Sequence, residues 1–192
     1  MTARLGLVCL LALGLLSGRG APAFAQAPAS YGLGRPATPA EIAALDIDVR
    51  PDGTGLPEGR GTPSAGAALY ASKCAQCHGA TGKEGPNDVL VGRVSGDTFP
   101  FPGDPKVPHT IGNYWPYATT VFDYVRRAMP PTAPGSLTDD EVYALTAFLL
   151  HANDLIAADA VMDRASLPKV QMPARKYFAP DTRKQLAEKP KP

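Results

Sequence analysis

Two cysteines and a neighbouring histidine constrain this chain more than any other feature. Cys74 and Cys77 are separated by two residues and are followed directly by His78. The third cysteine, Cys9, lies in an apolar run near the N-terminus. One close pair cannot form the disulfide framework that small secreted proteins use. The pair is therefore expected to attach or bind something else.

The N-terminus has the pattern of a secretory signal peptide. Arg4 precedes an apolar run from about Leu5 to Leu16, which is shorter than a transmembrane helix needs. Residues 23–25 (AFA) form a small-x-small cleavage site before Gln26. We therefore expect a signal peptide at residues 1–25, the loss of Cys9 with it, and a periplasmic location. The alternative is an uncleaved membrane anchor.

Three functions are considered for the cysteine pair in an exported protein: zinc binding, redox chemistry and haem attachment. A structural zinc site needs four ligands, and the three histidines do not supply the usual spacing. A thioredoxin-like redox pair follows a strand, whereas the residues before Cys74 (SAGAALYASK) are typical of a helix. C-x-x-C-H is the attachment motif of c-type haem. We predict one haem c, bound through thioethers at Cys74 and Cys77, with His78 as an axial iron ligand.

Helical patterns alternate with long irregular segments, as 19 glycines and 21 prolines in 192 residues require. The sequence predicts a signal peptide at 1–25, an N-terminal extension and linker at 26–61, a haem domain at 62–153 and a C-terminal extension at 154–192. The two extensions are expected to wrap a partner or to pack loosely on the haem domain. Helices are predicted at Pro39–Leu45, from Thr62-Pro63 to the motif, from after Pro116 to about Ala128, and from a Thr138/Glu141 capping box to Asn153.

The charge of the chain bears on nucleic acid as a possible partner. Without Arg4 and Arg19, the chain carries 17 Lys and Arg against 18 Asp and Glu, and no basic stripe is present. This balance gives no indication of nucleic-acid binding.

The sixth iron ligand is predicted to be Met129. It follows a helix and precedes Pro130 in a proline-rich loop, which would hold the thioether sulfur with little entropy to lose. Met172, which also precedes a proline, is the main rival. Three other side chains could also bind the iron: Met162, His109 and His151.

Several further side chains are candidates for the haem crevice. Tyr114, Trp115 and Tyr117 are predicted to line it or to bond the haem propionates, and the alternative is an ordinary aromatic core. Arg126 and Arg127 are expected near the propionates, at a partner surface, or simply at a favourable helix C-terminus. Lys73, Lys83 and Arg93 are candidates for a docking ring around an exposed haem edge. The alternative is ordinary solvated surface charge.

The order helix, C-x-x-C-H, loops, helix, Met-Pro and helix over residues 64–153 resembles a class I cytochrome c. The resemblance implies an all-α fold of three to four helices around one covalently bound haem, with long loops and Pro/Gly-rich extensions. It also implies that Leu69 and Tyr70 pack against Leu145, Phe148 and Leu149.

A narrower resemblance covers most of the chain after the signal. The segments at 31–62, 110–154 and 163–173 (among them TIGNYWPYATTVFDYVRRAMPP) are similar to the cytochrome subunit of sulfite or sulfane dehydrogenases and to Sox cytochromes. Some Sox forms carry a second haem domain, whereas this chain has a single C-x-x-C-H. The resemblance implies a non-catalytic subunit that accepts electrons from a molybdopterin dehydrogenase and passes them to another cytochrome c or an oxidase. A free-standing electron shuttle and a haem enzyme or gas sensor with an open sixth position are the alternatives.

Overall fold

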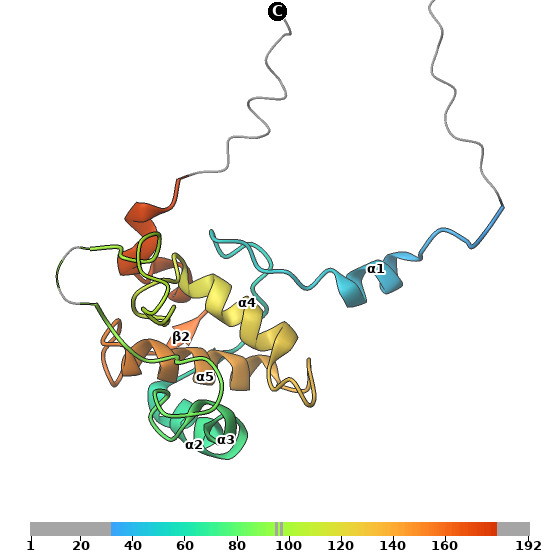
Figure 1. The fold of residues 1–192 in the computed structure, drawn as a ribbon. Helices are drawn as coiled ribbons and strands as arrows, with labels where there is room; N and C mark the ends of the chain where they lie inside the picture. The colour runs from blue at the N-terminus through green and yellow to red at the C-terminus, as the bar shows by residue number, and fades with distance from the viewer. Residues whose placement is uncertain (1–31, 95, 97, 180–192) are drawn as a thin grey trace, which may run out of the picture. The chain divides into compact units, whose positions relative to one another are not determined.

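The computed structural model describes residues 32–94, 96 and 98–179; the expected signal peptide and residues 180–192 lie outside them. Residues 32–39 belong to one unit, and the other described residues belong to a second, compact unit. The described chain contains five α-helices (Figure 1): α1 (Pro39–Leu45), α2 (Pro63–Lys73), α3 (Ala75–His78), α4 (Ala118–Ala128) and α5 (Asp139–Ala152). The helical class and the four longer helices agree with the prediction.

Little of the described chain is strand. β1 (Arg60–Gly61) and β2 (Met162–Asp163) pair antiparallel, with Arg60 opposite Asp163, and the 3-10 helices η1 (Leu167–Lys169) and η2 (Pro173–Tyr177) follow. In the parts of the chain that the structure describes, no helix has the length and apolarity to cross a membrane.

α5 begins at the predicted capping box. The Thr138 hydroxyl accepts from the Glu141 backbone N–H at 3.3 Å, and the Glu141 carboxylate accepts from the Thr138 N–H at 2.8 Å. This last bond is the main reason that the pKa of Glu141 is lowered. The predicted apolar face is buried at Val142, Leu145 and Leu149. α5 is therefore the central helix, and α2, α4, β1 and β2 pack on it.

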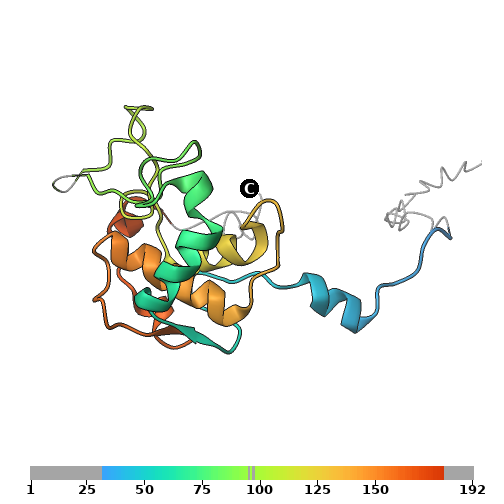
Figure 2. The same cartoon turned by 90° about the horizontal axis from the view of Figure 1, so that it is seen from below.

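α2 crosses α5 at close range (Figure 2). At the crossing, a Cβ atom on Gly66 would lie 1.9 Å from the backbone oxygen of Ala144. Beside it, the rings of Tyr70 and Phe148 are 4.8 Å apart. The packing of these two helices, which the resemblance implied, is confirmed, and it depends on the missing side chain of Gly66.

Gly66→Ala is expected to lower the free energy of unfolding by about 3 kcal/mol, because the helices must move apart to admit the methyl group. Chemical denaturation measures the change. Gly103→Ala is the matched control, since the nearest atom to a Cβ there is 3.8 Å away. Equal stability of the two variants would contradict the close crossing.

The segments on either side of residues 62–153 also belong to the core. Val49 and Leu56 on the N-terminal side, and Leu167 and Met172 on the C-terminal side, are buried in the same hydrophobic cluster as α4 and α5. The backbone N–H of Val49 donates to Asp123 of α4 at 2.9 Å. These four residues therefore pack on this chain, and the compact unit extends beyond the expected haem domain.

Asp123→Ala is expected to lower the free energy of unfolding by about 2 kcal/mol. It removes the acceptor for the Val49 N–H and leaves that buried donor without a partner. Thermal or chemical unfolding tests this against Asp159→Ala, which removes an exposed carboxylate. A change of the same small size in both variants would show that the bond from Val49 to Asp123 contributes little to the stability of the protein.

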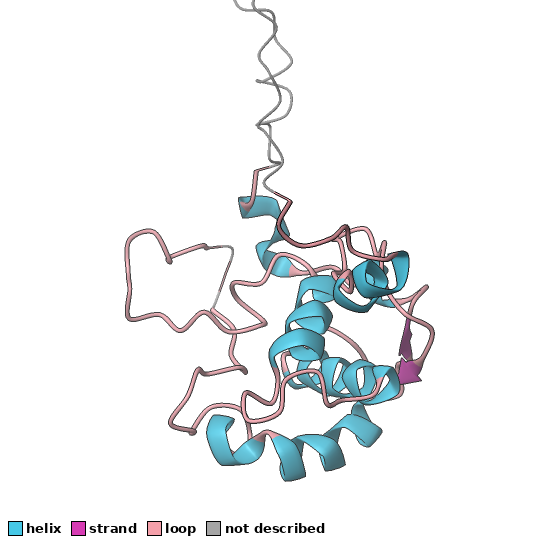
Figure 3. Cartoon of the chain, turned by 90° about the vertical axis from the view of Figure 1, so that its right-hand side faces the viewer, coloured by secondary structure: helices cyan, strands magenta, loops and turns pink. Residues whose placement is uncertain are grey.

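The chain between α3 and α4 is a long loop, as predicted. Its described residues form turns and irregular backbone, drawn in pink in Figure 3. Backbone bonds nevertheless organise it: the N–H groups of Leu90 and Val91 both donate to the Gly82 oxygen, and Ile111 N–H donates to the Leu90 oxygen. The loop thus folds back on itself beside α3 and α5.

Candidate functional site

The C-x-x-C-H motif lies at the junction of α2 and α3. Cys74 is the C-cap residue of α2, and its backbone N–H donates to the Tyr70 backbone oxygen at 2.9 Å. α3 ends at His78 because Gly79 takes φ 82°, a left-handed conformation that favours glycine. The Tyr70 hydroxyl donates to the Gly79 oxygen at 3.0 Å. The motif is therefore fixed to α2, and through α2 to α5.

Both thiols of the motif are half-buried and not bonded to each other. Burial raises the pKa of Cys74 to about 11, with a smaller opposing effect from Lys73. Reactive Cys-x-x-Cys pairs have lowered thiol pKa values. This surrounding therefore argues against the redox-pair alternative.

The zinc alternative also lacks ligands. Within the described ranges, no three His, Cys, Asp or Glu side chains gather in a way that could hold a metal ion. The motif has only one histidine beside its two thiols, so a tetrahedral protein site is not formed.

One ring nitrogen of His78 has a fixed partner. Nδ1 lies 2.8 Å from the backbone oxygen of Asp88. Because a carbonyl oxygen can only accept, Nδ1 carries a proton in this bond, and in the neutral ring Nε2 then has the free lone pair. This is the arrangement in which a histidine binds a metal through Nε2 while its other nitrogen is oriented by a backbone carbonyl.

A cavity of about 1080 Å³ opens beside His78. Its volume is at the upper end of the range for small-molecule sites. The walls come from the long loop, α4 and α5, and they are mostly apolar. They include Leu90, Ile111, Trp115, Val121, Tyr124, Val125 and Leu149.

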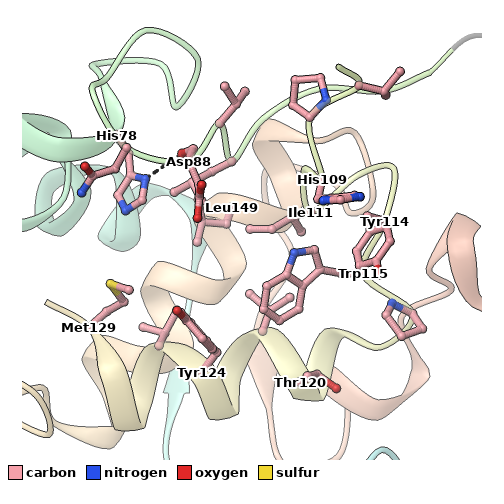
Figure 4. Close-up of a pocket in the computed structure, with 18 of the residues that line it drawn as sticks. His78, Asp88, His109, Ile111, Tyr114, Trp115, Thr120, Tyr124, Met129 and Leu149 are labelled. Atoms are coloured by element: carbon pink, nitrogen blue, oxygen red, sulfur yellow. Dashed lines mark hydrogen bonds between the residues drawn. The ribbon is translucent and has the colours of Figure 1, made fainter. Parts of the chain in front are cut away.

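His78 and Met129 lie on different walls of this cavity. Figure 4 shows the His78 ring extending from the α3 side and the Met129 side chain from the end of α4. Met129 has left the helix, with φ −113° and ψ 144°, as its place before Pro130 predicts. Cys74 and Cys77 lie in the turn just before His78 and are not themselves among the residues that line the cavity. An imidazole nitrogen and a thioether sulfur on the walls of a large apolar cavity, with two thiols in the adjoining turn, are the groups that a covalently bound haem needs.

The rival ligands are placed differently. Met162 and Met172 are buried in the hydrophobic core and are not among the residues that line this cavity. His151, also outside the lining, has Nδ1 3.1 Å from the Ile156 oxygen. His109 does line the cavity, but its ring lies 4.1 Å from that of Tyr114, on a wall away from Met129 (Figure 4).

The predicted crevice residues divide into two groups. Tyr114 and Trp115 line the cavity. Tyr117 and Arg126 are not among the lining residues. The Tyr117 ring lies 4.8 Å beneath the Arg175 guanidinium, and Arg126 bonds Asp139 at 3.0 Å and the Ile47 oxygen at 3.2 Å. Arg175 and Ile47 lie in segments whose position the sequence pattern did not reveal.

Two elements of the site were not predicted. The Asp88 carbonyl orients His78, and a backbone acceptor leaves no signature in a sequence. Asn153 was read only as the end of a helix, but its side-chain amide makes hydrogen bonds to the loop residues Leu90, Gly92 and Gly112. The length of the loop indicated that something must organise it, and the haem was the expected organiser, so the role of Asn153 was missed.

Comparison with known proteins agrees with this geometry. A family model described as cytochrome c oxidase, cbb3-type, subunit III matches residues 61–149. The crystal structure of the sulfane dehydrogenase SoxCD from Paracoccus pantotrophus contains a similar chain, with 43% sequence identity and a TM-score of 0.67. The match covers 84% of this chain and 80% of that one.

The matched region contains the motif, the cavity and the two helices that cross behind it. A cytochrome c domain implies a haem cofactor and a role in electron transfer rather than catalysis. This chain therefore belongs to the Sox-type family of c-type cytochromes.

Proposed function

We propose that this chain is an exported monohaem cytochrome c, the electron-accepting subunit of a molybdenum-containing dehydrogenase that oxidises a reduced sulfur compound. The observation that carries the proposal is the joint placement of His78 and Met129 on the walls of one apolar cavity next to the C-x-x-C-H turn. The similarity to a chain of a sulfane dehydrogenase supports the partner class.

In this proposal, Cys74 and Cys77 would hold the haem through thioethers, and His78 Nε2 and Met129 Sδ would bind its iron. Bound there, the haem supplies reversible one-electron chemistry. The Asp88 carbonyl holds the His78 ring in one orientation and one tautomer. Leu90, Ile111 and the other apolar wall residues would shield a bound haem from water.

The ligand pair fits the direction of electron flow. Met/His ligation raises the reduction potential relative to two histidines, and an apolar surrounding favours the form of lower charge. Both effects favour acceptance of electrons from a reduced sulfur donor. The chain then passes them, one at a time, to another cytochrome c or an oxidase.

Export through the expected signal peptide at residues 1–25 places this reaction in the periplasm, where haem c is attached to the motif. Residues 1–25 lie outside the described structure, so the sequence pattern alone supports this part of the proposal.

The proposal is tested by gentle purification from the native periplasm at low salt. The haem-containing fraction is assayed for molybdenum and sized in its native state. We expect molybdenum and haem to elute together as one complex of defined stoichiometry. A haem fraction without molybdenum, with this chain eluting alone, would contradict the proposal and favour a free-standing electron shuttle.

A further inference from the structure

The side chain of Asn153 satisfies all its hydrogen-bonding capacity within the protein. It lies at the end of α5 with only 1% of its surface exposed. Its Oδ1 accepts from the N–H groups of Gly92 at 3.0 Å and Gly112 at 3.1 Å. Its Nδ2 donates to the oxygens of Leu90 at 3.2 Å and Leu149 at 2.8 Å. Two acceptor sites and two N–H donors are the full inventory of an amide side chain.

These four bonds join three parts of the cavity wall. Leu90 and Leu149, which accept from Asn153, both line the cavity. Ile111, the neighbour of the bonded Gly112, lines it as well. The two loop segments, 90–92 and 110–112, are also joined directly. Ile111 N–H donates to the Leu90 oxygen, and the Thr110 hydroxyl donates to the Gly92 oxygen at 2.7 Å. Asn153 itself is not among the lining residues.

The same network reaches the histidine. The Asp88 carbonyl, which accepts from His78, lies between two anchored residues. On one side, Asn87 N–H donates to the Cys77 oxygen at 3.0 Å, within the motif turn. On the other side, Leu90 donates to the Gly82 oxygen at 2.8 Å and accepts from Asn153. Asn153 is thus the anchor that ties this carbonyl to α5.

We propose that Asn153 is a positioning residue for the haem site. Through Leu90 and Gly92 it fixes the Asp88 carbonyl against His78 Nδ1, and it thereby sets the orientation and donor strength of the axial imidazole. The proposal rests on the proposed haem ligation by His78. It does not depend on which protein donates the electrons.

The chemistry of the amide makes a specific variant informative. Asn153→Asp keeps the acceptors for Gly92 and Gly112 but removes both donors, so the Leu90 and Leu149 oxygens face a carboxylate. The residue is nearly the same size, so the cavity wall is not emptied. The expected consequence is a displaced Leu90, a looser Asp88 carbonyl and a weaker hydrogen bond from His78.

The test uses the haem-loaded full chain. Hydrogen exchange of the His78 Nδ1 proton is measured by NMR in the ferrous protein, and the midpoint potential is measured by redox titration. For Asn153→Asp we expect exchange to accelerate by about tenfold or more, as loss of one hydrogen bond implies, with a shifted potential. Leu167→Ala is the control, because Leu167 is fully buried in the core but lies outside the cavity lining.

If Leu167→Ala lowers stability but leaves His78 exchange and potential unchanged, a general loss of stability does not explain the effect. The proposal is overturned if Asn153→Asp behaves like the wild type in both readouts, or if the control changes them equally. Should Asn153→Asp not fold, Thr110→Val carries the test, since it removes only the hydroxyl bond to Gly92. A smaller change in the same direction supports the proposal, and no change overturns it. Both readouts need only a loaded haem, so they are independent of the sulfur donor.

Discussion

A chain in which Cys74 and Cys77 are both replaced by serine is expected to carry no covalently bound haem after export. Serine cannot form the thioethers, and His78 and Met129 alone would leave a haem that denaturant removes. The measurement is haem-specific detection of the denatured chain, together with its intact mass. The wild type should carry the mass of one haem.

The contribution of the thiols is separated from that of the fold by a second variant. Ser72→Ala changes a neighbouring exposed residue of α2 and should leave one covalent haem per chain. Covalent haem on the double serine variant would show that the motif is not the attachment site. A second haem on the wild type would refute the monohaem proposal.

Met129→Ala is expected to lower the midpoint potential by about 100 mV or more, a modest part of the roughly 0.8 V that axial ligands span. The haem remains attached through its thioethers, and the open sixth position binds carbon monoxide in the ferrous protein. Redox titration and the absorption spectrum measure both effects. Met/His ligation raises the potential, so its loss must act downward.

Met172→Ala is the matched control for this experiment. Met172 is 5% exposed, lies in the hydrophobic core and is absent from the cavity lining. Its removal should cost about 2–5 kcal/mol of stability and leave the potential and spectrum of the folded protein unchanged. If Met172→Ala instead opened the sixth position, the assignment of Met129 would fail.

The parts of the fold that could be predicted are those encoded locally. Thr138 and Glu141 sit at the spacing of a capping box, and Pro130 follows the residue at which α4 must end; both signals lie within a few residues of the feature they specify. The C-x-x-C-H motif is equally local. These elements were located correctly because no distant contact was needed to specify them.

The features that the sequence did not predict depend on contacts between residues far apart in the chain. Strands of two residues each, β1 and β2, are 100 residues apart in the sequence and have no alternating pattern to reveal them. The burial of Leu167 and Met172 depends on a tail whose composition indicated an irregular extension. The contact between the Tyr117 ring and Arg175 of that tail also joins residues far apart in the sequence.

The candidate site shows the same division. His78 and Met129 could be proposed from sequence, because few side chains in the chain can bind iron. Their supports could not be proposed. The Asp88 carbonyl and the four bonds of Asn153 follow from the path of a long loop, which no periodic pattern describes.

The central claim is that electrons from a reduced sulfur compound enter the haem held by this chain. The most direct measurement is stopped-flow spectroscopy of the complex purified with its molybdenum partner, mixed anaerobically with sulfite or a sulfane donor. The account predicts reduction of one haem per chain, at least as fast as the partner turns over. Turnover of the partner with an artificial acceptor, while the haem remains oxidised, would contradict it.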